Sequence, residues 1–443
     1  MKRESPDSSG TALKQCTCTA CPLLCDDILI THEGVEQACA HGSTSIRAAM
    51  ADDEARASAG QPREACENDS PLARAAAIER AAEMLASARR VLVTGLASAT
   101  LEATTAACDL GEMLGAAVDA GLPDSARAAG PTIARAGEVT AAFEELRDRA
   151  DLIIFWCCDP AASHPRFIER FVTPPLADGS QRRTIAIGSG SVMPDASTHR
   201  HLPLGRDLAV EAARWLQMRI AGRHTKPTDA PFSATCVAIE EAIRSAACVA
   251  IVTADADDSV GLEAWSIVHL VRTIAHEKPA FQIPLSSGIT AGGANVAGAA
   301  AACTWRYGAA GAIARADRLG SLFLPAESDA RRLIDRGEVD AVLVLGQLSG
   351  PLEQAIAVRG DALSLVRISN AAEMPRKPTG HSIHIRCSSE MLATTGTMLR
   401  EDGRRVVLVP HQQATLPQMR ELLIDLTQAV RRSLTVPAAG GRS

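Results

Sequence analysis

Short apolar runs alternate with longer amphipathic segments from residue 73 to residue 434. A run of four to eight apolar residues is typical of a strand buried on both faces, whereas apolar residues spaced three and four apart indicate a helix. The runs predict strands at residues 91–95, 151–156, 184–188, 248–253, 281–284, 340–346, 363–368, 384–386 and 406–409. The amphipathic segments predict helices at residues 73–90, 101–114, 207–221, 260–276 and 416–434. This alternation predicts an α/β protein whose parallel sheets are covered by helices on both faces.

The pattern divides the chain into two α/β units with a smaller part at each end. The first unit is predicted at residues 73–230 and the second at residues 231–362, separated by a break that contains two prolines. Residues 1–72 hold a cysteine-rich module that ends in a linker, because residues 51–72 lack apolar periodicity. Residues 363–443 are predicted to contain short strands, a helix and a tail.

Composition and charge exclude two classes of partner. The 443 residues include 45 Lys and Arg against 52 Asp and Glu, a net charge of −7, and only 3% are aromatic. A nucleic-acid binder normally carries a basic surface, so we expect no nucleic-acid partner. The first ten residues lack the apolar core of a signal peptide, and the most apolar long stretch, residues 295–314, is mostly Ala and Gly interrupted by Arg306. We therefore expect no membrane partner and a cytoplasmic location.

Five of the thirteen cysteines lie in the first 39 residues. Four of them have the spacing Cys18-x2-Cys21-x3-Cys25-x13-Cys39, in which short loops can present four sulfurs from one side. Four thiolates suit a [4Fe-4S] cluster or a tetrahedral zinc ion. The spacing favours the cluster, because structural zinc sites usually pair their ligands in two separated knuckles. The alternative is a chance run of small buried cysteines, which would have to place four of them within 22 residues.

These residues resemble a known family. Residues 18–28 read Cys-Thr-Ala-Cys-Pro-Leu-Leu-Cys-Asp-Asp-Ile, which is similar to the N-terminal cluster-binding stretch of the molybdenum- and tungsten-pterin oxidoreductases, and specifically of the metal-pterin subunit of formylmethanofuran dehydrogenase. Further matches follow in order along nearly the whole chain: Trp156, Cys158, Asp159, Pro160, His164, Pro165, Arg166, Asn295, Trp305, Arg400, Asp402 and Gly403. The resemblance implies a molybdopterin-oxidoreductase-like fold, with a small N-terminal cysteine module and two Rossmann-like parallel-sheet units.

The chain departs from this family where the metal and the pterin are bound. The family has a Cys-His-Gly-Pro loop whose cysteine ligates tungsten or molybdenum, and the corresponding residues here are Ala128, Ala129, Gly130 and Pro131. Alanine cannot ligate a metal ion. An Arg-rich stretch that helps the family hold its anionic pterin is replaced by the apolar residues 320–325. We therefore expect neither a tungsten nor a molybdenum pterin.

The resemblance then implies the degenerate bacterial form of this subunit. Such a chain would be a non-redox, structural subunit of the formyltransferase/hydrolase complex. That complex belongs to tetrahydromethanopterin-dependent one-carbon metabolism, and its other subunits would be the partners of this chain in formaldehyde oxidation to formate. Two alternatives remain: an active tungsten- or molybdenum-pterin formylmethanofuran dehydrogenase subunit, and a zinc-knuckle interaction protein. We expect Trp156 and Trp305 to serve packing or an interface. His164 and Arg166 would form a partner-facing polar patch or cap a turn.

Overall fold

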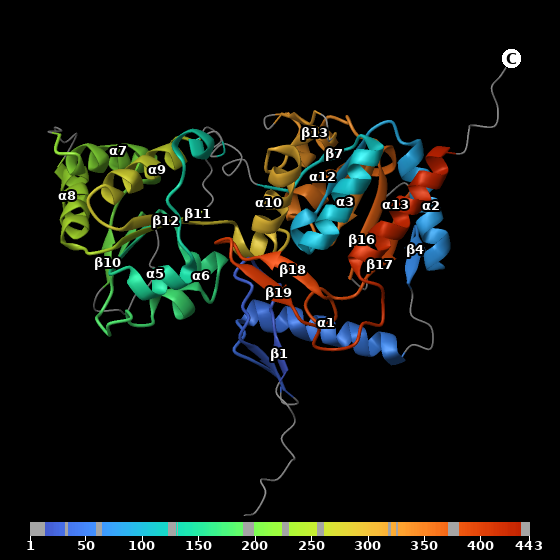
Figure 1. The fold of residues 1–443 in the computed structure, drawn as a ribbon, viewed down its shortest axis with the longest axis horizontal. Helices are drawn as coiled ribbons and strands as arrows, with labels where there is room; N and C mark the ends of the chain where they lie inside the picture. Colours follow the sequence, from blue (N-terminus) through green and yellow to red (C-terminus); the bar gives the residue numbers. More distant parts are fainter. Residues whose placement is uncertain are drawn as a thin grey trace, which may run out of the picture.

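Two α/β lobes lie side by side in the computed structural model (Figure 1), with a smaller antiparallel part and helix α1 (Ala40–Ser58) next to them. The structure describes residues 14–31, 34–58, 64–122, 130, 132–188, 199–223, 230–254, 261–317, 320–324, 327–370 and 381–435. The two lobes are built on a nine-stranded and a five-stranded sheet. The predicted α/β architecture with parallel sheets is confirmed.

The larger lobe is built on the nine-stranded sheet. Its central strands are parallel and follow the order β7 (Ala117–Val118), β6 (Val91–Thr94), β15 (Ala341–Leu345), β16 (Ser364–Ser369) and β17 (Ser382–Arg386). Antiparallel strands extend both edges: β13 (Ile313–Arg315) and β14 (Leu322–Phe323) beside β7, and β4 (Ala65–Glu67) and β5 (Ser70–Leu72) beside β17. The central strands are almost wholly buried, which explains their continuous apolar runs.

Helices cover both faces of this sheet. Leu343 and Val366 belong to the core on one face, which is completed by α2 (Arg74–Ser87), α3 (Leu101–Leu114), α10 (Val296–Tyr307) and α13 (Met419–Thr435). Val342 and Leu365 belong to the opposite face, which is covered by α11 (Ala330–Asp335) and α12 (Gly350–Arg359). Neighbouring residues divide between the two cores because successive side chains of a strand point to opposite faces.

The smaller lobe has a five-stranded sheet in which all strands are parallel. Its order is β10 (His199–Leu202), β9 (Arg183–Ile187), β8 (Leu152–Trp156), β11 (Val249–Ala254) and β12 (Ala280–Leu285). One face packs on α7 (Ala209–Ile220), α8 (Ala230–Ser245) and α9 (Leu262–Ala275). The other face shares a core with α5 (Phe143–Arg149), the π-helical turn Ile168–Val172 and the cysteine module.

The remaining elements are short and lie around the two lobes. The cysteine module contains the antiparallel strands β1 (Lys14–Cys16), β2 (Ile28–Ile30) and β3 (Val35–Glu36), and the C-terminal part contains the hairpin of β18 (Gly396–Leu399) and β19 (Arg405–Leu408). Helix α6 (Pro160–Ser163) and four 3-10 turns, Leu96–Ser98, Arg206–Leu208, Gly288–Thr290 and Gly360–Ala362, lie in the connections. Within the described ranges, every helix is too short or too polar to cross a bilayer.

The strands do not sort into the two sheets at the predicted boundaries. β8 pairs with β11 across the boundary between residues 230 and 231, and β15 pairs with β16 across the boundary after residue 362. β6, from the first predicted unit, pairs with β15 from the second. The predicted linker at residues 51–72 contains the end of α1 and both β4 and β5. The predicted boundaries at residues 72, 230 and 362 therefore do not coincide with the limits of the sheets, because a parallel pair needs a long crossover and can join distant parts of a chain.

One buried histidine in the larger sheet makes the stability depend on pH. His384 on β17 is 2% exposed and lies 2.8 Å from the Ser369 hydroxyl. Burial, followed by the charges of Arg367 and Arg386, lowers the pKa of His384 to about 4. An unfolded histidine titrates near 6.5, so the unfolded chain binds the proton first as the pH falls. We expect this contribution to be complete above pH 6.5 and to be lost toward pH 4, by at most about 1.4 kcal/mol per pH unit.

Urea unfolding at pH 7 and pH 5.5 measures this effect. The free energy of unfolding should drop by about 1 kcal/mol more in the unsubstituted chain than in a His384→Gln variant, because glutamine does not titrate. Equal drops in both chains would show that His384 does not cause the dependence.

Candidate functional site

The four spaced cysteines line one small cavity in the N-terminal module. Cys18, Cys21, Cys25 and Cys39 share it with His41 and Arg166 among its walls. The loop between them is closed by backbone hydrogen bonds, from Cys18 N to the Cys25 carbonyl at 2.8 Å and from Leu24 N to the Cys21 carbonyl at 3.1 Å. Leu24 has a φ of +42°, an unusual value for a residue with a side chain, so the sharp turn is held by this environment. All four cysteines therefore line one cavity, and the metal centre expected of them stays a prediction.

A glycine leaves room beside two of these sulfurs. A Cβ atom at Gly42 would lie 3.0 Å from Cys18 Sγ and 3.6 Å from Cys39 Sγ. The backbone N–H of Gly42 donates to Cys39 Sγ at 3.3 Å. The missing Cβ lets the Cys18 sulfur approach the backbone closely, and the N–H donor would stabilise a thiolate at Cys39. The sequence motif did not include Gly42, whose only signal is its place three residues after Cys39.

The protonation of these thiols depends on what they bind. Burial raises the pKa of the Cys18 thiol to about 12 and also raises those of Cys21 and Cys25. The nearby Arg170 and Arg166 partly oppose this rise at Cys25. Without a metal the cavity therefore favours neutral thiols, whereas a bound cation would deprotonate them. Within the described residues, no three His, Cys, Asp or Glu side chains have the arrangement of a site for a single metal ion.

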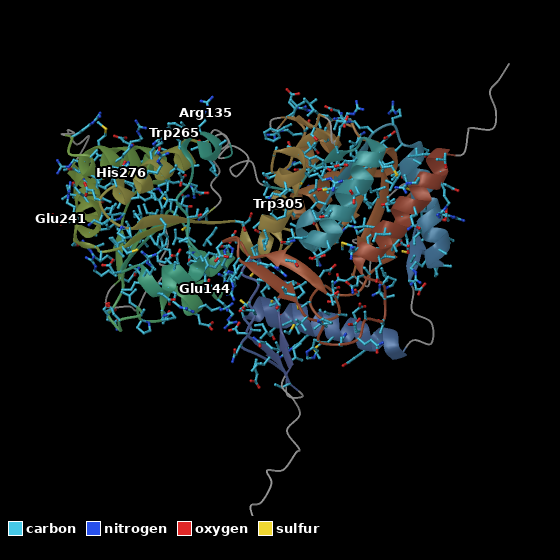
Figure 2. The ribbon with its side chains drawn as sticks, viewed as in Figure 1. Arg135, Glu144, Glu241, Trp265, His276 and Trp305 are labelled. Carbon is cyan, nitrogen blue, oxygen red and sulfur yellow. The ribbon has the colours of Figure 1, made fainter. Side chains whose placement is uncertain are left out.

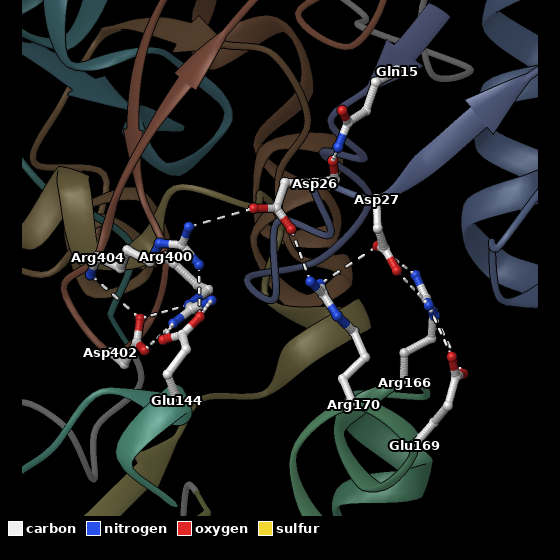
Figure 3. Close-up of polar contacts among 10 residues, drawn as sticks. All are labelled: Gln15, Asp26, Asp27, Glu144, Arg166, Glu169, Arg170, Arg400, Asp402 and Arg404. Carbon is white, nitrogen blue, oxygen red and sulfur yellow. Dashed lines mark hydrogen bonds and ion pairs between the residues drawn. The ribbon is translucent and has the colours of Figure 1, made fainter. Parts of the chain in front are cut away.

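Two ion pairs fasten the cysteine module to the smaller lobe (Figure 3). Arg166 donates from both terminal nitrogens to the two carboxylate oxygens of Asp27, each at 2.8 Å, and Arg170 donates to Asp26 at 2.7 Å. Asp26 and Asp27 directly follow Cys25 in the sequence. The Leu-Cys-Asp-Asp stretch therefore supplies a sulfur to the cavity and two carboxylates to the lobe contact. Pro165 also lines the cysteine cavity.

His164 and Arg166 do not form a partner-facing polar patch, which was one of the two alternatives that the sequence left open. His164 is fully buried and Arg166 is 6% exposed. His164 Nε2 lies 2.8 Å from a carboxylate oxygen of Glu401, and the His164 backbone ends α6 by donating to the Pro160 carbonyl. The partner-facing interpretation is therefore corrected, and the turn-capping alternative holds for the His164 backbone.

A second buried arginine joins the C-terminal hairpin to the smaller lobe. Arg400, 1% exposed, donates to Asp402 at 2.8 Å and to Glu144 at 2.8 Å (Figure 3), and its guanidinium lies 4.9 Å from the ring centre of Phe143. Asp402 also accepts the backbone N–H of Phe143 at the start of α5, at 2.7 Å. Burial opposes ionisation of Glu144, but Arg400 outweighs it and lowers the pKa of Glu144 to about 2. Gly403 completes the hairpin turn with a φ of +81°.

The Trp-Cys-Cys-Asp-Pro stretch ends the central strand of the smaller sheet. Trp156 is 1% exposed, as expected of a packing residue. Cys157 has a φ of +50°, in the region that favours glycine. Cys158 Sγ contacts the Val252 carbonyl at 3.4 Å. Asp159 accepts the Ala161 N–H at 3.0 Å and Pro160 opens α6, so these two residues begin a short helix.

Asn295 joins two segments of the larger lobe to the C-terminal hairpin. Its side chain donates to the Ala99 carbonyl at 2.7 Å and accepts the Leu399 N–H at 2.8 Å, and it is fully buried. A Cβ at the neighbouring Gly293 would lie 2.3 Å from the Ala97 carbonyl carbon, so only glycine allows this approach. Trp305, ten residues later on α10, is 71% exposed (Figure 2). Trp305 is thus free to serve as an interface residue.

A larger cavity opens between the carboxyl end of the larger sheet, helix α1 and the connection at residues 288–294 that joins the two lobes, and it is called the interlobe cavity below. Its volume is about 490 Å³, and its walls include Ser98, Gln347 and Asn370 at the ends of β6, β15 and β16. His41 lines both this cavity and the cysteine cavity. The charged side chains among the described wall residues are the carboxylates Asp52 and Glu390, apart from any charge on His41. No sequence pattern pointed to Glu390. Of the predicted ligand loop, Ala128, Ala129 and Pro131 lie outside the described residues, and Gly130 is exposed.

The fold can be compared with known proteins. No family model matches the chain, and no curated protein matches it. A chain in the X-ray crystal structure of the formyltransferase/hydrolase complex (FhcABCD) from Methylorubrum extorquens, in complex with methylofuran, is similar over 83% of this chain and 99% of its own length. The TM-score is 0.68 and the sequence identity is 19%. The protein therefore has the fold of a chain from that complex, in agreement with the resemblance of its motifs.

Proposed function

We propose that this protein is a non-redox, structural subunit of a formyltransferase/hydrolase complex, corresponding to the metal-pterin subunit of formylmethanofuran dehydrogenase. Its partners are the other subunits of the complex, which carry out formaldehyde oxidation to formate in tetrahydromethanopterin-dependent one-carbon metabolism. The observation that carries the proposal is the shared fold, which spans 99% of a chain from a multi-subunit formyltransferase/hydrolase complex. Because low identity shows only the fold, the motifs that match in order from Cys18 to Gly403 give the proposal its second support.

The charge of the interlobe cavity supports a loss of redox chemistry. A pterin dinucleotide carries phosphates, which need cations or clustered N–H donors. The described wall instead offers the carboxylates Asp52 and Glu390 and no Lys or Arg side chain. The sequence adds Ala128 at the family's metal-ligand position. These residues favour a cavity that no longer accommodates a tungsten or molybdenum pterin.

The cysteine module is proposed to keep a cofactor of its own. Cys18, Cys21, Cys25 and Cys39 would hold one [4Fe-4S] cluster, a group that supplies a one-electron centre or a structural cross-link when bound. Gly42 would support it with its N–H, and its missing side chain lets the Cys18 sulfur lie close to the backbone. The ion pairs of Asp26 and Asp27 would then attach the loaded module to the smaller lobe.

Elemental analysis of the purified complex tests the loss of redox function. We expect tungsten, molybdenum and extractable pterin to be absent at stoichiometric level, because alanine occupies the ligand position and the described cavity wall is acidic. The measurement is mass spectrometry of metals together with fluorescence of oxidised pterins. One tungsten or molybdenum per chain would favour the active formylmethanofuran dehydrogenase subunit and overturn the proposal.

An exposed tryptophan tests the structural role. Trp305 projects from the end of α10, and large exposed aromatic residues often dominate interface energies. Trp305→Ala should weaken co-purification of the partner subunits about tenfold while the melting temperature of the chain stays unchanged. Val358→Ala is the matched control, because Val358 on α12 is 77% exposed and also apolar. Equal recovery of the partner subunits with both variants would show that Trp305 does not contribute to the interface.

A further inference from the structure

The interlobe cavity lies where the larger sheet reverses its winding direction. From β6 the chain passes through α3 to β7 on one side, and from β15 it passes through α12 to β16 on the other side. β6 and β15 are adjacent and parallel, and the connections that follow their carboxyl ends run in opposite directions from this point. Open α/β sheets bind their ligands in such crevices. Ser98 and Gln347, which follow these two strands, both line the cavity, whose volume of about 490 Å³ is that of a small-molecule site.

The two acidic residues of the described wall differ in what neutralises them. Asp52 accepts two hydrogen bonds from Arg386, at 2.9 and 2.8 Å, so its charge is balanced within the protein. Glu390 has no ion pair with a described residue, and its carboxyl group contacts the weak donor Cys387 Sγ at 3.9 Å and its own backbone N–H. Burial raises the pKa of Glu390 to about 7. Its carboxylate is therefore costly to ionise unless a cation joins it.

A buried hydroxyl beside this carboxyl group also lacks a partner. Ser389 is 3% exposed, lines the same cavity, and its Oγ has no hydrogen-bond partner in the described structure. Buried hydroxyl groups are normally hydrogen-bonded, because an unsatisfied one costs about 1–3 kcal/mol. Two adjacent residues of the cavity wall thus carry a carboxyl group with no described cation beside it and a buried hydroxyl with no described hydrogen-bond partner. A ligand with several N–H donors and a positive charge would satisfy both.

We propose that the interlobe cavity binds a small organic ammonium compound, with its –NH3+ group held by the Glu390 carboxylate and the Ser389 hydroxyl. The ammonium group supplies three donors, one for Ser389 and two for the carboxylate. Gln347 and Asn370 supply polar side chains for the rest of the molecule. This inference rests on the proposed function only in that no pterin fills the cavity. It adds a binding activity that a purely structural subunit would not need.

A series of four-carbon probes of equal length tests the charge preference. Isothermal titration calorimetry of the purified full chain, or of its complex, would compare 1,4-diaminobutane, 1,4-butanediol and succinate. We expect saturable binding of the diamine, at least tenfold weaker binding of the diol and no binding of succinate. Binding of succinate in preference to the diamine would overturn the inference.

Two variants locate the site and a third controls for general attraction to an acidic protein. Glu390→Gln should weaken the diamine at least tenfold, and Ser389→Ala should weaken it severalfold. Glu83→Gln removes an exposed carboxylate from a different groove and should leave the affinity unchanged. If Glu390→Gln failed to fold, Ser389→Ala and the probe series would still show whether the diamine binds in this cavity. Equal losses in Glu83→Gln and Ser389→Ala would mean non-specific binding and refute the site.

The two proposals can fail separately. Stoichiometric tungsten or molybdenum pterin in the complex would contradict the proposed function and would also occupy this cavity. Absence of metal pterin together with absence of diamine binding would contradict only the present inference.

Discussion

Replacing Arg400 by Ala is expected to destabilise the folded chain by about 3–5 kcal/mol. Arg400 is 1% exposed, and its guanidinium donates hydrogen bonds to both Asp402 and Glu144. The Asp402 side chain is also 1% exposed, so the substitution would leave a carboxylate buried without its cation. The loss would include the contacts of the guanidinium with the rings of Phe143 and Phe171. Urea unfolding followed by circular dichroism gives the free energy of unfolding for both chains.

A neighbouring arginine provides the control. Arg404 also pairs with Glu144, but its side chain is 46% exposed, so Arg404→Ala should cost about 1 kcal/mol or less. Adding Asp402→Asn to Arg400→Ala should restore part of the stability, since it removes the unpaired charge. If Arg400→Ala and Arg404→Ala had equal effects, the buried network would not be the contact that joins the hairpin to the smaller lobe.

The strands and helices of the two lobes could be predicted from local patterns. Residues 101–114 form the expected helix α3 without any shift, and the runs near residues 91 and 340 form β6 and β15. Helix α1 was missed because residues 51–58 carry charged and small residues without an apolar stripe. The pairing of β6 with β15 could not be predicted, because it is set by tertiary contacts between residues 250 positions apart in the chain.

The candidate site was predictable only in part, for a related reason. The spacing of Cys18, Cys21, Cys25 and Cys39 indicates convergence because short loops bring sulfurs together. The partners of that module come from distant segments, such as Arg166 beside Asp27, and no local pattern indicates such a pair. Glu390 likewise becomes unusual only through burial and the lack of a described ion pair, which a sequence does not reveal.

Replacing one of the four cysteines of the cavity should abolish iron binding, whereas replacing the nearby Cys16 should leave it intact. We expect anaerobically purified protein to contain about four iron atoms per chain, the content of one [4Fe-4S] cluster. Cys25→Ala removes a sulfur from the shared cavity and should eliminate the iron together with the charge-transfer absorbance.

Cys16→Ala is the matched control, because this fifth cysteine is equally buried but does not line the cavity. Cys16 is 2% exposed, and its Sγ points to the Met391 carbonyl at 3.4 Å. Burial raises the pKa of the Cys16 thiol to about 11, as it raises that of the Cys18 thiol in the cavity, so the position of Cys16 outside the cavity is what excludes it as a ligand. The two variants remove the same atoms from positions nine residues apart in one small module, so a general loss of folding would affect both. Iron lost from Cys16→Ala as well, or tightly bound zinc in place of iron, would mean that the spacing of the four cysteines does not specify a [4Fe-4S] cluster.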